Sequence, residues 1–148
     1  MTIVALASDH AGVGLKSDLG EELRRLGYEV LDFGPATTAS VDYPDFAVKV
    51  TGAIISARAA LGVLVCGTGI GMGITANKVP GIRAAVCRTE FEARMARMHN
   101  DANVLCLGQR VTGVGLAVGV LKAFLEASFE GGRHAARVEK IRQLEEKR

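Results

Sequence analysis

The sequence of 148 residues has no tryptophan, few other aromatic residues and only 3 prolines and 3 cysteines. The cysteines, Cys66, Cys87 and Cys106, form no Cys-x-x-Cys pair, so neither a disulfide framework nor a zinc knuckle is predicted. This cysteine usage favours a reducing compartment and therefore a cytoplasmic location. No apolar run approaches the roughly 18 residues of a membrane span. The apolar start ends at Asp9 with no basic segment before it, which predicts a strand rather than a signal peptide.

The sequence also has little excess charge of either sign. It contains 18 basic and 16 acidic residues, which gives a formal net charge of +2. That value is too small to indicate nucleic acid or an acidic membrane surface as a partner. The composition is 49% hydrophobic and 23% charged, which is typical of a globular protein rather than a disordered one. The length fits a single domain over residues 1–148.

Short apolar runs alternate with amphipathic stretches along the whole chain. The runs predict five strands, at residues 3–7, 28–33, 61–65, 82–86 and 104–107. The intervening segments predict helices at residues 15–26, from 44 onward, and at 68–77, 89–98, 114–125 and 133–148. Strands separated by helices pair in parallel and are covered on both faces. We therefore expect an α/β fold: a single-domain, three-layer αβα sandwich around a five-stranded parallel sheet, Rossmann-like in its crossovers.

The last two helices raise the question of a partner subunit. Residues 114–125 are apolar almost all round, and Gly115 and Gly119 lie four apart, which allows close backbone approach. Burial within one subunit and burial against a second copy fit this helix equally well. The final helix, from about residue 132 onward, is charged and has little apolar surface of its own. We expect it to pack on a partner subunit.

Open parallel sheets bind ligands outside the carboxyl ends of their strands, and the richest loop there runs from Cys66 to Gly71. Its glycines allow a ligand close to the backbone, and the following helix start points N–H groups at an anion. Such a setting also stabilises a thiolate at Cys66, although a buried structural cysteine is an equal alternative. The loop is neither a Walker A motif nor a good dinucleotide fingerprint.

Two further candidates carry histidine. Asp9 and His10 directly follow the first strand. A charge at the end of a buried strand is costly unless it is solvated or takes part in function, so both residues are candidates. The alternative for Asp9 is that it caps a helix. His99 ends the helix after the fourth strand, and a helix of about ten residues runs back about 15 Å. His99 is thus expected at the opposite edge of the sheet from Cys66, where it could serve another subunit's site. Its alternative is a favourable interaction with the helix dipole.

The basic candidates are three arginines. Arg110 follows the fifth strand, whereas Arg133 and Arg137 lie four apart and share one helical face after Gly131-Gly132. Guanidinium groups on one face make a phosphate clamp. A solvated basic face explains the same spacing.

Several of these residues belong to blocks that together resemble one family. The blocks are Asp9-His10-Ala11-Gly12, Asp42-Tyr43-Pro44-Asp45, Cys66-Gly67-Thr68-Gly69-Ile70-Gly71, Ala76-Asn77-Lys78, Gly81-Ile82-Arg83-Ala84, His99-Asn100-Asp101-Ala102-Asn103-Val104 and Glu130-Gly131-Gly132-Arg133-His134. In this order, over essentially the whole chain, they resemble type B ribose-5-phosphate isomerases, a family that extends to galactose-6-phosphate and allose-6-phosphate isomerases.

The resemblance implies an aldose–ketose isomerase of the pentose phosphate pathway that works through a cis-enediolate, without a metal or other cofactor. It implies Cys66 as the base and His99 as the ring-opening residue. It also implies a homodimer, or a dimer of dimers, whose active sites are shared between subunits. The substrate-binding residues that it implies are Asp9, His10, Tyr43, Gly67, Thr68, Gly69, Ile70, Gly71, Asn100, Arg110, Arg133 and Arg137.

Three alternatives to a ribose 5-phosphate isomerase stay open at this point. One is an isomerase of another aldose phosphate, with a six-carbon or four-carbon chain. A second is a phosphometabolite-binding module without catalysis, which would need neither Cys66 nor His99. A third is a thiol-dependent hydrolase or transferase, which would need a histidine beside Cys66 in the same site.

Overall fold

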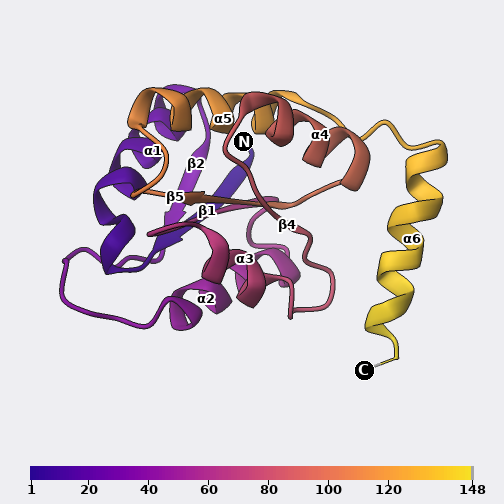
Figure 1. The fold of residues 1–148 in the computed structure, drawn as a ribbon, viewed down its shortest axis with the longest axis horizontal. Helices are drawn as coiled ribbons and strands as arrows, with labels where there is room; N and C mark the ends of the chain where they lie inside the picture. The colour runs from indigo at the N-terminus through magenta and orange to yellow at the C-terminus, as the bar shows by residue number, and fades with distance from the viewer. Residues whose placement is uncertain (148) are drawn as a thin grey trace.

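Five parallel strands form one sheet in the order β2-β1-β3-β5-β4 (Figure 1). The structure is a computed structural model, and it describes residues 1–147. The strands are β1 Ile3–Ser8, β2 Glu29–Asp32, β3 Leu61–Cys66, β4 Ala84–Val86 and β5 Val104–Gly108. The helices are a 3-10 turn, His10–Gly12, followed by α1 Val13–Arg25, α2 Tyr43–Ile55, α3 Ile70–Ala76, α4 Glu90–Asn100, α5 Val114–Glu126 and α6 Arg133–Glu145. The predicted αβα architecture is confirmed.

Helices cover both faces of the sheet and give the two halves of the core. Helices α1, α4 and α5 pack on one face, where Leu19, Leu23 and Phe124 are fully buried (Figure 1). Helices α2 and α3 pack on the other face, around Val50 and Met72. The three central strands, β1, β3 and β5, are therefore buried on both faces of the sheet. This is why they appear in the sequence as continuous apolar runs.

Strand register brings three carboxyl ends together. Ser8 of β1 lies opposite Val65 of β3, and Cys66 at the end of β3 lies opposite Gly108 of β5. The chain leaves β1 toward one edge of the sheet and leaves β3 toward the other, which makes the gap between them a topological switch point. The loops that follow β1, β3 and β5 therefore meet at one place.

Several element boundaries differ from the prediction by a few residues. The helix after Cys66 begins at Ile70 rather than at residue 68, because Gly69 adopts a left-handed conformation with φ 82°. The fourth strand is shorter than predicted, since Ile82 and Arg83 precede it as a loop. Thr89 caps α4 as predicted, and its hydroxyl accepts a hydrogen bond from the Glu92 N–H at 3.1 Å.

The apolar helix α5 is mainly a core helix of its own subunit. Its Val120, Leu121 and Phe124 are fully buried, and the space where a Gly119 Cβ would lie is filled by the Glu90 side chain of α4. The close approach that Gly119 allows is thus made by α4 of the same chain. Leu116, in contrast, is 47% exposed.

Helix α6 lies beside the three layers and approaches the end of α4 (Figure 1). Near the end of α6, the Glu145 side chain accepts a hydrogen bond from the Gly81 N–H at 3.0 Å. The helix follows Gly131 and Gly132, whose φ angles of 67° and 53° turn the chain away from α5. Its one buried residue is His134, while Ile141 and Leu144 remain exposed. The predicted helix extended to Arg148, which lies outside the described residues. Among residues 1–147, no helix combines the length and the apolar character that a membrane crossing requires.

Replacing Phe124 by alanine should lower the free energy of unfolding by about 3–5 kcal/mol, because it leaves a cavity beneath α5. The exposed Leu116 on the same helix is the matched control, and Leu116→Ala should cost less than about 1 kcal/mol. Chemical denaturation monitored by circular dichroism measures both. A Leu116→Ala cost as large as that of Phe124→Ala would contradict the assignment of α5 as a helix of its own subunit's core.

Candidate active site

The loops after β1, β3 and β5 enclose a cleft of about 410 Å³ at the carboxyl edge of the sheet. The residues that line it are Asp9, Tyr43, Cys66, Gly67, Thr68, Ile70, Gly71, Ile74 and Arg110. All of these except Ile74 are candidates from the sequence. Of the described residues, no histidine lines this cleft.

Cys66 ends β3 with its thiol at the base of the cleft. The residue is only 5% exposed, and its Sγ accepts a hydrogen bond from the Gly69 N–H at 3.1 Å. Gly69 can present that N–H because of its left-handed backbone, and a Cβ there would lie 3.1–3.2 Å from backbone atoms of Leu107. This hydrogen bond therefore fixes the position of the Cys66 sulfur within the loop.

The loop after β5 holds the Cys66 loop in place. The Gln109 N–H donates to the Cys66 carbonyl at 2.9 Å, and the Arg110 N–H donates to the Gly67 carbonyl at 3.0 Å. Gly108 is required for this contact, because a Cβ there would lie 2.5 Å from the Thr68 backbone. As a result, the guanidinium group of Arg110 lies against Gly67 at the cleft.

Gln109 has a role that the sequence analysis missed. Its side-chain oxygen accepts a hydrogen bond from the Leu15 N–H at 2.8 Å and so joins the first turn of α1 to the loop after β5. The residues are 94 positions apart, and no sequence pattern connects them. Gln109 therefore supports the cleft without lining it.

Asp9 both lines the cleft and caps the 3-10 turn that follows it. The residue is 7% exposed, and its Oδ1 accepts a hydrogen bond from the Ala11 N–H at 2.9 Å. The capping alternative and the position in the cleft are therefore both correct. One carboxylate oxygen is used locally, and the second Asp9 oxygen is the one available to a ligand.

His10 and Tyr43 take different positions around the same opening. The His10 Nδ1 lies 3.1 Å from the Val41 nitrogen and 3.2 Å from its oxygen, so His10 holds the loop between β2 and α2. It is not among the residues that line the cleft. The Tyr43 ring covers Gly71, where a Cβ would lie 2.7 Å from ring atoms.

The other two thiols are inert. Burial raises the pKa of Cys87 to about 12 and raises the pKa of Cys106 further still. Both thiols are therefore protonated near neutral pH, as is typical of buried structural cysteines.

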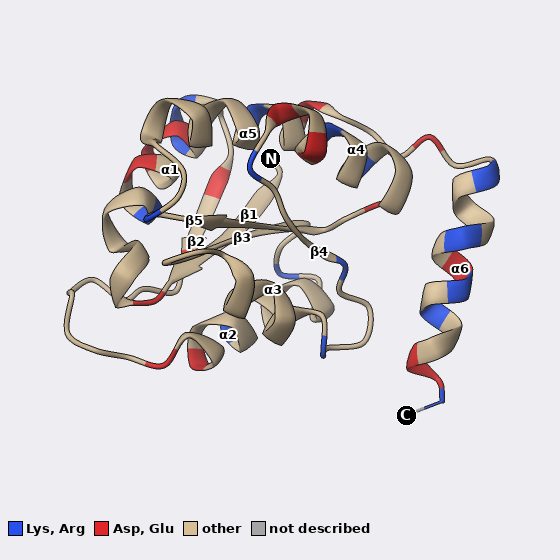
Figure 2. Cartoon of the chain, viewed as in Figure 1, with Lys and Arg blue, Asp and Glu red and all other residues tan. Residues whose placement is uncertain are grey.

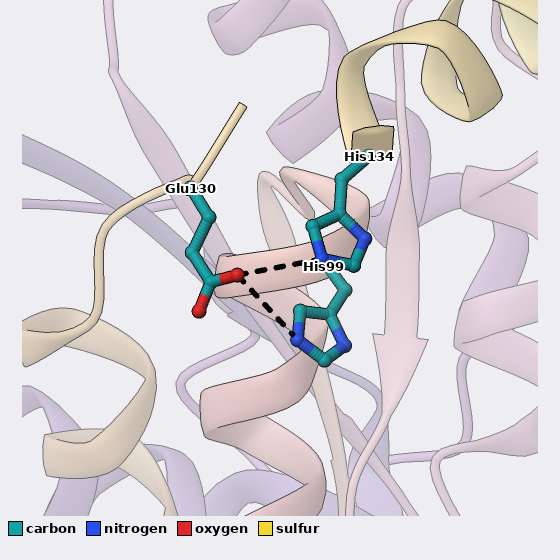
Figure 3. Close-up of side chains that lie close together, drawn as sticks. All are labelled: His99, Glu130 and His134. Atoms are coloured by element: carbon teal, nitrogen blue, oxygen red, sulfur yellow. Dashed lines mark ion pairs between the residues drawn. The ribbon is translucent and has the colours of Figure 1, made fainter. Parts of the chain in front are cut away.

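A second group of candidates lies at the other end of the strands. Helix α4 runs back from its start near the carboxyl edge, so His99 and Asn100 lie next to the residues that precede β5. His99 stacks on His134 of α6, with ring centroids 4.1 Å apart and planes 10° apart (Figure 3). The pKa of His134 is lowered by burial first and then by nearby positive charge, including that of Arg133 and Arg137. None of these residues lines the cleft of Cys66 in this chain.

The trio of His99, Glu130 and His134 offers three ligand atoms within 4.8 Å of one another, the one such group of His, Cys, Asp or Glu among residues 1–147. Its geometry does not favour a metal ion. The two imidazoles are nearly parallel, so their lone pairs run side by side instead of converging. Arg133 and Arg137 also add positive charge nearby.

Comparisons with known proteins identify the family of the chain. Residues 4–141 match the family model described as Ribose/Galactose Isomerase. The chain is 43% identical to ribose-5-phosphate isomerase B of Escherichia coli, covering 100% of this chain and 99% of that protein. It is 44% identical to D-erythrulose-4-phosphate isomerase of Pectobacterium atrosepticum, covering 95% and 93% of the two chains. The solved structure of ribose-5-phosphate isomerase B from Clostridium thermocellum superposes with a TM-score of 0.96, at 52% identity over 99% of each chain. The chain therefore belongs to the ribose/galactose isomerase family.

Proposed function

We propose that this protein interconverts ribose 5-phosphate and ribulose 5-phosphate, with Cys66 as the proton-transfer base. The observation that carries the proposal is the Cys66 thiol in the cleft, which accepts a hydrogen bond from the Gly69 N–H. The family match and the high identity to isomerases of ribose 5-phosphate support the substrate.

The reaction moves one proton between adjacent carbons. The Cys66 thiolate removes the proton from C2 of the open-chain aldose, and the electron pair moves onto the C1 oxygen to form a cis-enediolate. The proton of the C2 hydroxyl passes to the C1 oxygen, and the Cys66 thiol returns a proton to C1 as the C2 carbonyl forms, which gives the ketose and restores the thiolate. The backbone of residues 67–71 would stabilise the enediolate oxygen, and removing one N–H donor of such a site typically costs 10²–10³-fold in rate.

The remaining candidates bind the parts of the sugar that do not react. Asp9 and Tyr43, which line the cleft, would bind hydroxyl groups together with Asn100. Arg110, at the same cleft, and His10 would bind the phosphate with Arg133 and Arg137. Holding a phosphate away from the reacting carbons supplies binding energy that orients them.

The functional protein is proposed to be a homodimer in the cytoplasm, or a dimer of dimers, with sites shared between subunits. The cleft of Cys66 has no histidine from its own chain, whereas His99, Arg133 and Arg137 gather at the opposite end of the strands. A two-fold related partner would bring one group to the other. Helix α6, with Ile141 and Leu144 exposed, is the element proposed to pack on that partner.

A second candidate substrate is a four-carbon sugar phosphate. The similarity to a D-erythrulose-4-phosphate isomerase over nearly the whole chain supports it. A thiol hydrolase, in contrast, has no support from the comparisons, because the family model and the relatives named above are isomerases.

Cys66→Ala should abolish isomerisation, with a loss of about 10²–10⁴-fold in kcat that matches the usual contribution of a general base. Binding of ribitol 5-phosphate, a non-reacting analogue, should stay close to wild type in calorimetry because the phosphate contacts remain. Cys87→Ala is the control and should retain turnover. Retained activity in Cys66→Ala would rule out Cys66 as the base.

Mixing Cys66→Ala subunits with His99→Ala subunits should restore activity that neither variant has alone. In a heterodimer with shared sites, one site carries both substitutions and the other carries none, so about half of the wild-type turnover returns. Differently tagged subunits allow the heterodimer to be purified and assayed. A verified heterodimer without activity would contradict the shared site.

A panel of aldose phosphates with four, five and six carbons should give the highest kcat/KM for ribose 5-phosphate. The comparison measures differential transition-state binding, in which each correctly bonded hydroxyl contributes. A higher kcat/KM for the four-carbon substrate would show that ribose 5-phosphate is not the preferred substrate. The proposed proton transfer by Cys66 would stand in that case.

A further inference from the structure

Three separate segments build the surroundings of His99. The residue lies in the last turn of α4, Glu130 lies in the linker after α5, and His134 lies in the first turn of α6 (Figure 3). Backbone hydrogen bonds hold the segments together: the Glu130 N–H donates to the Met98 carbonyl at 3.0 Å, and the His134 N–H donates to the Gly131 carbonyl at 3.0 Å. The trio is therefore part of the folded chain.

The carboxylate of Glu130 faces the same nitrogen atom on both rings. Its Oε2 lies 3.3 Å from Nε2 of His134 and 3.9 Å from Nε2 of His99 (Figure 3). The side chain of His134 is only 8% exposed, whereas that of His99 is 35% exposed. His134 is thus the fixed ring, and His99 is the ring that a ligand can reach, with its Nδ1 facing away from the carboxylate.

Burial, together with the positive charges around it, favours the neutral form of His134. Its pKa lies below the usual value of an imidazole, first because of burial, and then because His99, Arg133 and Arg137 repel a positive charge there; Glu130 opposes the shift. A neutral ring can stack on His99 in either protonation state without like-charge repulsion. The Glu130 carboxylate is then available to balance charge on His99.

We propose that Glu130 and His134 are positioning residues that hold the His99 imidazole for opening of the furanose ring. This inference rests on the proposed function, in which His99 acts on the cyclic sugar. Ring opening breaks the bond between C1 and the ring oxygen and forms the C1 carbonyl. The proton of the C1 hydroxyl moves to the ring oxygen through the imidazole, so no other reactant is consumed.

Two contacts make this positioning specific. Glu130 draws the Nε2 side of His99 toward itself and leaves Nδ1 for the substrate, and His134 fixes the plane of the ring by stacking. A separation of 3.9 Å is longer than a hydrogen bond, and contacts of catalytic groups commonly tighten when substrate binds. The oriented His99 imidazole can then accept and donate a proton at Nδ1, on the side that faces the substrate.

The test separates ring opening from proton transfer. Ribose 5-phosphate is cyclic in water, whereas ribulose 5-phosphate cannot form a furanose because its C5 oxygen carries the phosphate. Conversion of ribose 5-phosphate needs both steps. Exchange of the C1 proton of ribulose 5-phosphate with deuterated water, followed by NMR, needs only the step at Cys66.

Glu130→Gln and His134→Ala should each lower kcat for ribose 5-phosphate by about 10- to 100-fold, part of the contribution of an acid–base group. The exchange rate with ribulose 5-phosphate should stay within about twofold of wild type, because the Cys66 cleft is unaltered. Glu130→Asp should recover part of the loss. Glu139→Gln, an exposed carboxylate on α6 that pairs with Arg142, is the matched control and should leave both rates unchanged.

An equal loss in both assays, or no loss in either, would overturn the positioning role. The variant His99→Asn separates the proposed role of His99 in ring opening from the positioning role of Glu130 and His134. If His99→Asn slows only the cyclic substrate and Glu130→Gln does not, positioning is wrong and the proposed role of His99 stands. If His99→Asn slows neither substrate, both are overturned. Loss of wild-type turnover after treatment with EDTA would identify the trio as a metal centre and would also overturn the inference.

Discussion

Two backbone hydrogen bonds extend the pairing of β3 and β5 beyond the ends of the strands, from Gln109 to Cys66 and from Arg110 to Gly67. They hold two loops at a distance that only Gly108 permits, and they bring the Arg110 guanidinium to the cleft. With the loop after β5 fixed, Gly69 packs against the Leu107 backbone in a left-handed turn and aims its N–H at the Cys66 sulfur. The position of the Cys66 sulfur and the position of the Arg110 guanidinium therefore depend on the same pairing.

The geometry of the α/β fold explains why the chain carries its candidate site residues at both ends of the strands. Strands deliver side chains to their carboxyl edge, so Asp9 and Cys66 meet there. A helix that follows a strand runs back across the sheet, so the end of α4 carries His99 to the other edge. Association of two copies can join the ends without a longer chain, which fits a fold that leaves α6 outside its three layers (Figure 2).

Positive side chains gather at the edge of the sheet that carries His99. Arg133 and Arg137 lie close to two imidazoles, an arrangement that would repel a doubly protonated pair. Burial keeps His134 neutral, and Glu130 supplies the one carboxylate that faces both rings. Basic side chains for an anion and an imidazole for proton transfer can then occupy one small region.

Periodicity and turn residues in the sequence were enough to predict the strands, the helices and the parallel sheet, because local chain preferences and burial on both faces leave a direct pattern. The Cys66 loop by itself left a structural cysteine as an equal alternative, and it was the resemblance of seven blocks over essentially the whole chain that indicated an isomerase. Only the tertiary structure decided the strand order, the contact of Gln109 with Leu15, and the use of Gly119 by α4. It also decided that His134 stacks on His99 beside Glu130. Such contacts join residues far apart in the chain, and they arise from packing of whole elements, which no local pattern of side chains records.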